Sequence, residues 1–564
     1  MDLLEYDPVS GYAHVYKDHF NAVADAFFEK AVQDGRIDAA LNAELSAELK
    51  DLQAQKEKLD GKHSLLIVLL VAAGIALVVW GFWIGSSASE ADKSVHWGIF
   101  IPVACGALGI ALFKIIPALR SLAGQIAQLE AQIREKYARI RELIAPLWRA
   151  FDWDTATNLI SKVLPPLHFD KFFSVERQLD FSNNFGFALV DDPDSTLTGI
   201  HSGTFYGYPF VFAEEIVFSM GERVWSNSIT ITYREKVTGP DGKSTWVTRT
   251  QILTASIVRP CPEYGMHRNF FFGHDAAPEL SFSRTPSSLS GGEGFWHSVG
   301  KKVQLRKLRK FEQNLTDDSQ YTMVANRDFE VLFRSENRDH EIGFRLLYTP
   351  LAQQYMVSLL NDRKEGYGDD FAYAKSNCVT RICSEHLNNT SLSALPFSSD
   401  LFELKEIKKL FLETSAEFFR SVYFTFAPLM LIPSYNTPRL HTEVPDEGGE
   451  IISECELEGA VYFKKAYFEP ERNITETIFN IRNFKAFSNC VEATVEACSF
   501  AGKERVEYVK EWGNDGKWHT IPVHWIEYIP IRRRTKIRAW RTRSETPPPG
   551  EALFTRRGIA VGKA

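Results

Sequence analysis

The stretch SLLIVLLVAAGIALVVWGFWIG, Ser64–Gly85, contains no charged residue. A bilayer core of ~30 Å needs ~20 apolar residues in a helix that rises ~1.5 Å per residue. A signal peptide would stand nearer the start of the chain and have a shorter apolar core. A buried helix of a soluble domain would show a polar face, and this stretch has none. It therefore predicts a membrane-spanning helix.

A second apolar run, WGIFIPVACGALGIALF (Trp97–Phe113), follows after a short polar gap. Apolar residues up to Leu119 extend this run, and Lys114 can reach the headgroups along its flexible stem. We expect a second span here, so that residues 64–119 form a transmembrane hairpin of two antiparallel helices.

The distribution of basic residues predicts the orientation of this hairpin, because Lys and Arg beside a span stay on the cytoplasmic side. The connecting loop contains one basic residue, Lys93. Both outer flanks contain several: Lys50, Lys56, Lys58, Lys62, Lys114, Arg120, Arg134 and Lys136. Both termini should therefore be cytoplasmic. Seven cysteines without a CxxC pair agree with a reducing compartment.

Apolar stripes flank the two predicted spans. After the second span, apolar residues recur at alternating steps of three and four, as in a coiled-coil seam: Leu119, Leu122, Ile126, Leu129, Ile133, Tyr137, Ile140 and Ile144. A similar stripe precedes the first span: Leu41, Leu45, Leu49, Leu52 and Leu59. Residues 1–63 and 120–150 should therefore supply the two helices of a cytoplasmic stalk. Pairing within one chain and self-association through the same seam are both open.

Beyond residue 150, aromatic-rich alternating segments replace the helical periodicity. Residues 228–258 and 504–531 each predict two strands joined by a Gly- and Asp-containing turn, and residues 329–348 predict another strand pair. Helices are expected after Thr349-Pro350, an N-cap followed by proline, and over residues 399–424.

These elements predict an α+β cytoplasmic region in which antiparallel sheet predominates. We expect an α+β domain at 151–435, a β-rich domain at 436–543 and a disordered tail at 544–564. The uncharged segment Ser421–Pro433 is too short to span a bilayer, so we expect it in the core rather than in a third membrane contact.

Two charge clusters lie in the C-terminal region. The basic cluster contains the candidate membrane-surface residues Arg532, Arg533, Arg534, Lys536, Arg538, Arg541 and Arg543. The acidic cluster contains Glu443, Asp446, Glu447, Glu450, Glu454, Glu456 and Glu458. They can pair with each other or lie on solvated strand faces. The functional hypothesis is that the basic cluster contacts anionic lipid headgroups, each cation contributing ~1 kcal/mol. No nucleic-acid partner is expected, since the net charge is −8 and no recognition module is present.

Several strings approach catalytic motifs but lack their context. Asp369 and Asp370 in GYGDDF follow the polar LNDRKE, not the apolar strand that a polymerase metal site requires. In GFWHSVGKK the glycines are one residue too far apart for a phosphate-binding loop, and Lys302 replaces the Ser or Thr. His386 beside Glu385 is interpreted as a turn or strand-edge pair. We predict no catalytic residue, cofactor or metal site.

Longer phrases carry a resemblance. They are SGTFYGYPFVFAEEIVF, TASIVRP, FEVLFRSENRDHEIGFRLLYTPLAQQYMVSLL, FGHDAAPELSFSR, YGDDF and SEHLNN. Together they resemble bacterial two-span membrane proteins of a family defined by a domain of unknown function, and related mycoplasma membrane proteins. The likeness covers about Met1 to Phe402 and departs at LYTP, where the commoner form has Leu before Thr. It implies a two-pass protein of the bacterial cytoplasmic (inner) membrane and transfers no activity.

Two classes of function fit this sequence. The first is a membrane-anchored cytoplasmic scaffold without catalytic activity, which binds a protein partner or self-associates through its stalk. The alternative is an oligomeric pore or gate controlled by the cytoplasmic region. Small residues such as Gly74 and Gly106 permit close helix contacts, but neither predicted span has polar residues to line an ion path.

Overall fold

The computed structural model describes residues 7–87, 99–106, 109–151, 154–187, 192–238, 243–291, 302–308, 310, 321–390, 401–439, 451–487, 489–542 and 553–564. The chain divides into two compact units. The helical unit comprises Ala24–Asp152 and Pro396–Thr414, and the body unit comprises Met1–Val23, Trp153–Leu395 and Ser415–Ala564. The predicted domains follow sequence order, whereas each unit is assembled from separate stretches of the chain.

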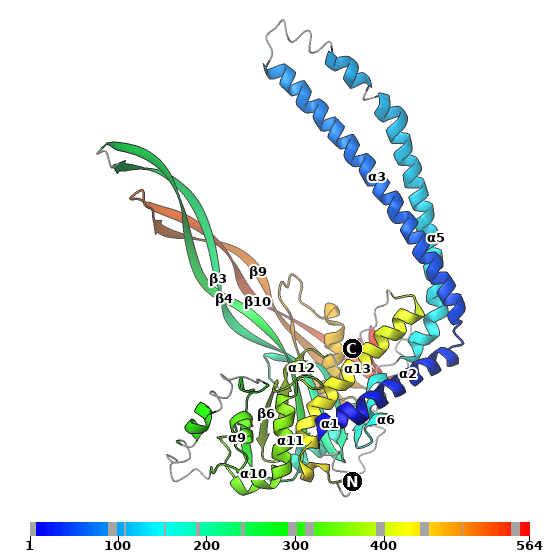
Figure 1. The fold of residues 1–564 in the computed structure, drawn as a ribbon, viewed down its shortest axis with the longest axis vertical. Helices are drawn as coiled ribbons and strands as arrows, with labels where there is room; N and C mark the ends of the chain where they lie inside the picture. Colours follow the sequence, from blue (N-terminus) through cyan, green and yellow to red (C-terminus); the bar gives the residue numbers. More distant parts are fainter. Residues whose placement is uncertain are drawn as a thin grey trace. The chain divides into compact units, whose positions relative to one another are not determined.

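The helical unit is dominated by two long helices, α3 (Ala39–Ser87) and α5 (Ile116–Ala150) (Figure 1). Asp38 begins α3, because its carboxylate accepts hydrogen bonds from the amides of Ala40 (2.9 Å) and Leu41 (3.0 Å). One unbroken helix thus contains both the first stalk stripe and the apolar stretch from Ser64. Parts of α2 (Lys17–Asp34) and α13 (Leu404–Met430) also belong to this unit.

The apolar stripes of α3 and α5 pack against each other within one chain. Leu45, Leu49, Ile140 and Ile144 are buried, whereas Leu122, Ile126, Leu129 and Ile133 are half-buried. Ion pairs flank the seam, with Lys56 Nζ 2.8 Å from Glu130 Oε1 and Lys136 paired with Glu48. These pairs show that the helices run antiparallel. The predicted intrachain stalk is therefore present, and burial increases toward its base.

We expect Leu49→Ala to destabilise this stalk. Leu49 is fully buried, and removing a buried leucine side chain costs roughly 2–5 kcal/mol. Limited proteolysis should then cleave the stalk faster while the apolar segments stay resistant to alkaline extraction. Glu57→Ala, an exposed position on the same helix, is the matched control. Equal digestion of the two variants would mean that the seam is not packed.

Among the described residues, α3 is the one helix long and apolar enough to cross a bilayer, and none of its apolar window is buried. The second predicted span is described in part, with helix at 99–106 and again from 109 into η3 (Ala111–Ile115) and α5. The predicted connecting loop, including Lys93, lies outside the described residues. The first span is supported by length and composition, and the second stays a prediction.

The larger sheet of the body unit has seven strands in the order β1-β2-β3-β4-β7-β6-β5. Every pair is antiparallel. Its strands are β1 (Leu167–Phe169), β2 (Ser195–Phe205), β3 (Tyr208–Thr238), β4 (Ser244–Gly273), β5 (Ser281–Arg284), β6 (Phe371–Ser376) and β7 (Val379–Ser384). A tight turn joins β2 to β3, in which Tyr206 (φ 51°) and Gly207 (φ 83°) both take the left-handed conformation of a type I′ hairpin.

A second, five-stranded antiparallel sheet has the order β11-β12-β10-β9-β8. Its strands are β8 (Ile478–Ala486), β9 (Val491–Trp512), β10 (Trp518–Arg541), β11 (Phe554–Arg556) and β12 (Ile559–Lys563). Helix α14 (Glu454–Phe463) covers one face, where Leu457 and Val461 pack with Phe479, Val495 and Ile537.

The four longest strands continue beyond their sheets as two ribbons, which we call the β arm (Figure 1). Ribbon 1 is the outer part of β3 and β4, from Phe218 to Tyr264, and ribbon 2 is the outer part of β9 and β10, from Gly502 to Tyr528. Leu253, Ala255 and Ile257 of ribbon 1 pack against Ile521 and Val523 of ribbon 2. The two strand pairs predicted at 228–258 and 504–531 are confirmed, although the Gly-Pro-Asp-Gly turn lies outside the described residues.

The core of the body unit is rich in phenylalanine. Phe426 of α13 lies 4.7 Å from Phe270 and 5.1 Å from Phe210 between ring centroids. Val422, Phe426 and Leu429 are fully buried, so the prediction that Ser421–Pro433 is core is confirmed. Shorter helices complete the described fold: α1 (Pro8–Gly11), η2 (Tyr12–Tyr16), α6 (Thr155–Val163), α7 (Val175–Phe185), a helical segment at 302–308, α9 (Arg327–Phe333), α10 (Glu341–Leu347), α11 (Pro350–Asn361), α12 (Glu385–Asn388), η4 (Pro433–Asn436) and η5 (Lys465–Tyr467).

Two predictions of local structure are wrong. Residues 329–348 form the helices α9 and α10 instead of a strand pair, because Asn326 and His340 cap two short apolar turns. The tail predicted to be disordered contributes β11 and β12, and β12 pairs with β10 from Ile559 to Lys563. The cap predicted at Thr349-Pro350 is confirmed, since the Thr349 hydroxyl accepts a hydrogen bond from the Ala352 amide at 3.3 Å.

Candidate functional sites

The basic cluster lies on β10, and its side chains alternate between the two faces of the strand. Arg534 Nη2 lies 2.8 Å from Glu496 Oε1, Arg538 Nη2 lies 2.5 Å from Glu492 Oε1, and Arg541 Nη2 lies 2.5 Å from Glu456 Oε2. The Arg533 guanidinium donates to the Glu469 carbonyl at 2.9 Å. These contacts neutralise part of the charge that lipid binding would use.

The remaining members of the basic cluster are Arg532 and Lys536, which are exposed, and Arg543, which lies outside the described residues. Of the acidic cluster, Glu443, Asp446, Glu447 and Glu450 also lie outside them. Glu456 is buried and links the two clusters through Arg541. The membrane-surface role of the basic cluster stays a prediction.

A cavity of about 570 Å³ lies between the larger sheet and the α14 side of the second sheet. Its polar walls come from separate elements: Asp192, Glu215, Asn269, Arg381, Glu454, Glu458 and Asn480. Asn269 organises one wall, because its amide donates to Glu215 Oε1 at 2.7 Å and its oxygen accepts from Arg381 Nε at 3.1 Å. Burial raises the pKa of the Glu215 carboxyl.

The chemistry of this cavity suits a small polar ligand. Four carboxylates and one guanidinium line it, so an amine or another cationic group is favoured over an anion. Glu458 is partly engaged already, since Oε1 accepts from the Leu197 amide at 2.8 Å. Within the described ranges, no group of three or more His, Cys, Asp or Glu side chains could hold a metal ion. Sequence reasoning missed this cavity, because its walls come from strands and a helix far apart in the chain.

Ser384, His386 and Asp370 have the residue types of a nucleophilic triad. His386 Nδ1 lies 2.5 Å from Asp370 Oδ2, and Nε2 lies 3.3 Å from Ser384 Oγ. Ser384 and His386 are both buried, however, and the Ser384 hydroxyl caps α12 by accepting from the Leu387 amide. The Tyr367 ring stacks on His386 with centroids 4.2 Å apart. These contacts hold the junction between β7 and α12, and the carboxylate that contacts His386 is that of Asp370.

Asp369, the other acid of GYGDDF, lies in a fully buried ion pair with Arg284, 2.5 Å from its Nη2. It also accepts a hydrogen bond from the Ser287 amide at 2.7 Å. The phrases FGHDAAPELSFSR, YGDDF and SEHLNN thus meet around β5, β6 and β7. Arg268 extends this cluster, since its amide donates to Asn388 Oδ1 at 2.9 Å. The described contacts of these phrases join β5, β6 and β7 to one another.

Comparisons with known proteins leave the family open. No family model, curated protein or solved structure matches the chain. The resemblance to bacterial two-span membrane proteins therefore stays a prediction from the quoted phrases.

Proposed function

We propose that the chain is a membrane-anchored cytoplasmic scaffold of a bacterial inner membrane. Its two-span hairpin would hold the body unit beneath the bilayer on the packed stalk of α3 and α5. The observation that carries this proposal is the apolar part of α3, of which none of the most apolar window is buried. Exposed apolar surface of this length supports a location in a lipid bilayer.

The body unit supports a binding role over a channel role. It presents the β arm, whose two outer faces are exposed, and the cavity at Glu215. Neither feature involves the apolar stretch. The scaffold should therefore have a stable partner, which binds the body unit or occupies the cavity.

Affinity purification of the full chain from native membranes, with quantitative mass spectrometry, tests the scaffold role. We expect one protein to be recovered in stoichiometric amounts, and to be lost when ribbon 1 is shortened by joining Gly221 to Cys261 through a two-residue turn. These residues are paired across the ribbon, so the shorter hairpin keeps its register. Ion leak from vesicles containing the purified chain would instead support the alternative pore.

Cysteine labelling of intact cells tests the topology. In a variant without the native cysteines, a reporter at Ser89 should be modified from outside, whereas a reporter at the exposed Ala564 should be protected. This result is expected because basic residues flank both spans on the inner side. Modification of both reporters would indicate a single-pass protein, and modification of Ala564 alone would reverse the orientation.

A further inference from the structure

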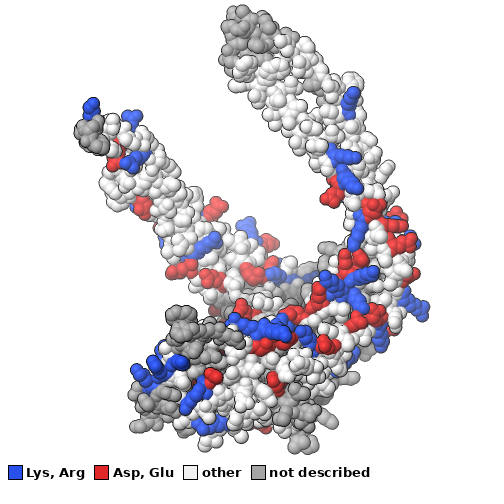
Figure 2. All heavy atoms as spheres, viewed as in Figure 1, with Lys and Arg blue, Asp and Glu red and all other residues white. Residues whose placement is uncertain are grey.

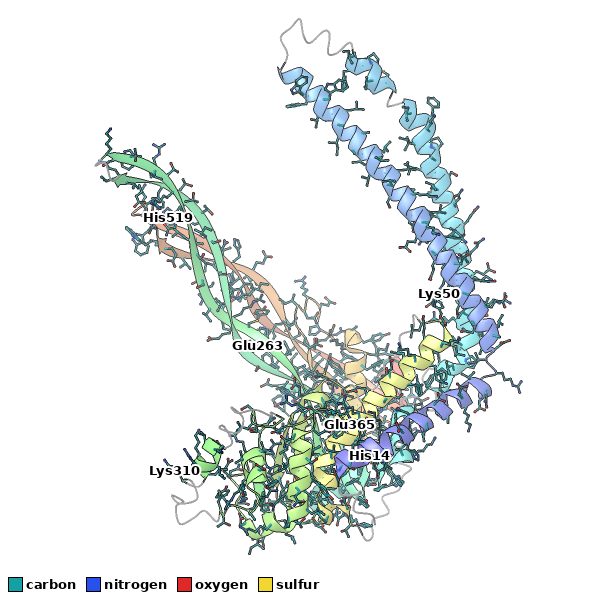
Figure 3. All side chains as sticks on the ribbon, viewed as in Figure 1. His14, Lys50, Glu263, Lys310, Glu365 and His519 are labelled. Atoms are coloured by element: carbon teal, nitrogen blue, oxygen red, sulfur yellow. The ribbon has the colours of Figure 1, made fainter. Side chains whose placement is uncertain are left out.

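The outer end of the β arm presents exposed tryptophans on both of its faces. Trp512 and Trp518 form the last pair of ribbon 2, with ring centroids 5.3 Å apart, and are 53% and 65% exposed. Trp246, near the end of ribbon 1, is 67% exposed. Figure 3 shows this end of the arm, where His519 marks ribbon 2.

Strand alternation assigns these rings to opposite faces of the arm. Leu253 and Ala255 of ribbon 1 face ribbon 2. Successive side chains of a strand point to opposite faces, and Trp246 is an odd number of residues away from Leu253 and Ala255, so it points away from ribbon 2. Ile521 of ribbon 2 faces ribbon 1, so Trp518 and its cross-strand partner Trp512 point away on the other side. A protein that docked on one outer face would leave the other tryptophans in water, whereas a surrounding medium would contact them all.

The charges at the arm end favour an anionic medium. Residues 234–249 contain four Lys and Arg against two Asp and Glu, and residues 508–520 contain two of each. Glu235 is paired with Arg249 at 2.5 Å and Asp515 with His519 at 3.0 Å. Lys236, Lys243, Lys510 and Lys517 are exposed beside the tryptophans. Figure 2 shows Lys and Arg gathered at the end of the arm.

Tryptophan and lysine together are typical of the bilayer headgroup region, where the indole ring is part apolar and part wet and lysine meets lipid phosphates. We infer that the end of the β arm binds the surface of an anionic lipid bilayer, with Trp246, Trp512 and Trp518 at the headgroup level. The inference rests on the proposed membrane anchoring, which tethers the arm to a bilayer.

The lengths of the elements permit this contact. The stalk part of α3, from Ala39 to His63, spans about 36 Å at ~1.5 Å per residue. Ribbon 1 from Phe218 to Thr238 spans about 66 Å at ~3.3 Å per residue. Ribbon 1 is therefore longer than the stalk part of α3.

Hydrogen–deuterium exchange of the full chain in lipid nanodiscs tests the inference. Peptides covering 234–249 and 508–520 should exchange about tenfold more slowly in discs with ~30% phosphatidylglycerol than in detergent. In discs of phosphatidylcholine alone, the slowing relative to detergent should be smaller. Peptides covering 224–232, whose outward side chains have no aromatic ring or charge, should be unchanged and serve as the internal reference.

The double variant Trp512→Ser, Trp518→Ser should lose this protection, whereas Val224→Ser, Ile252→Ser, at exposed positions in the middle of ribbon 1, should keep it. Equal exchange in discs and detergent would overturn the inference. So would protection that appears only with two chains per disc, since this indicates contact between copies. Alkaline extraction, measured in parallel, separates the two proposals: a chain that resists extraction without arm protection retains the anchor and loses only the arm contact.

Discussion

Asp369→Asn is expected to lower the free energy of unfolding by roughly 3–5 kcal/mol, because it leaves a buried guanidinium without a counter-ion. The side chains of Arg284 and Asp369 are both fully buried. Arg284 also donates to the carbonyls of Phe333 at 2.9 Å and Phe371 at 3.1 Å. The amide of asparagine could replace one hydrogen bond but not the charge.

Chemical denaturation of the detergent-solubilised chain, followed by near-ultraviolet circular dichroism, measures this effect. Glu527→Gln is the matched control, because it removes an ion pair with Arg505 whose side chains are 38% and 45% exposed. An exposed pair contributes ~0–1 kcal/mol, so the control should shift the midpoint little. Equal shifts for the two variants would contradict the burial of the Arg284 pair.

The sequence was most informative where a local rule sufficed. The cap at Thr349, the hairpin at Asn514-Asp515-Gly516 and the alternating strands of the β arm follow from neighbouring residues. The apolar stretch from Ser64 and the stalk seam follow from composition and period. In each case the stabilising interactions join residues that are close together in the sequence, within a helix turn, a hairpin or a repeating apolar pattern.

The failures come from contacts between distant residues. The run from Phe329 to Phe333 is short and apolar, and periodicity does not distinguish a buried strand from a buried helix at this length. The helix also contacts Arg338, whose side chain is fully buried and donates to Glu330 at 2.8 Å and to Glu341 at 2.7 Å. This network joins α9 to α10 and has no sequence signature.

In the candidate sites, too, local sequence identified the residues, whereas contacts between distant residues decided their arrangement. The basic cluster was evident from composition, but its partners Glu492 and Glu496 lie on the neighbouring strand, and cross-strand register decides that they pair. The cavity required the larger sheet, α14 and β8 to come together, which no local pattern indicates. The tryptophans at the arm end were visible as residues, but only the pairing of the ribbons places them on opposite faces.

The C-terminal strands supply the second large expected effect. Phe554 and Val561 belong to the core under α14, together with Ile537 and Ala539. Polar and proline-rich composition before residue 553 suggested disorder, but the apolar residues that follow it are 3% exposed or less at Phe554, Ile559 and Val561. A short segment with little intrinsic strand propensity can still form a strand when it pairs with an existing strand and buries its apolar side chains.

Phe554→Ala is therefore expected to destabilise the body unit by roughly 3–5 kcal/mol, the usual cost of emptying a buried phenylalanine site. Phe487→Ala, at a phenylalanine that is 47% exposed, is the control and should cost far less.

The same core predicts how two fragments of the chain behave. A fragment from Asp152 to Pro530 should fail to melt cooperatively, because it lacks Ile537, Ala539, Phe554 and Val561 of this core. A fragment that lacks only the helical unit's residues 24–152 keeps this core and should melt cooperatively in differential scanning calorimetry. Cooperative melting of the fragment that ends at Pro530 would show that the C-terminal strands contribute little to the core.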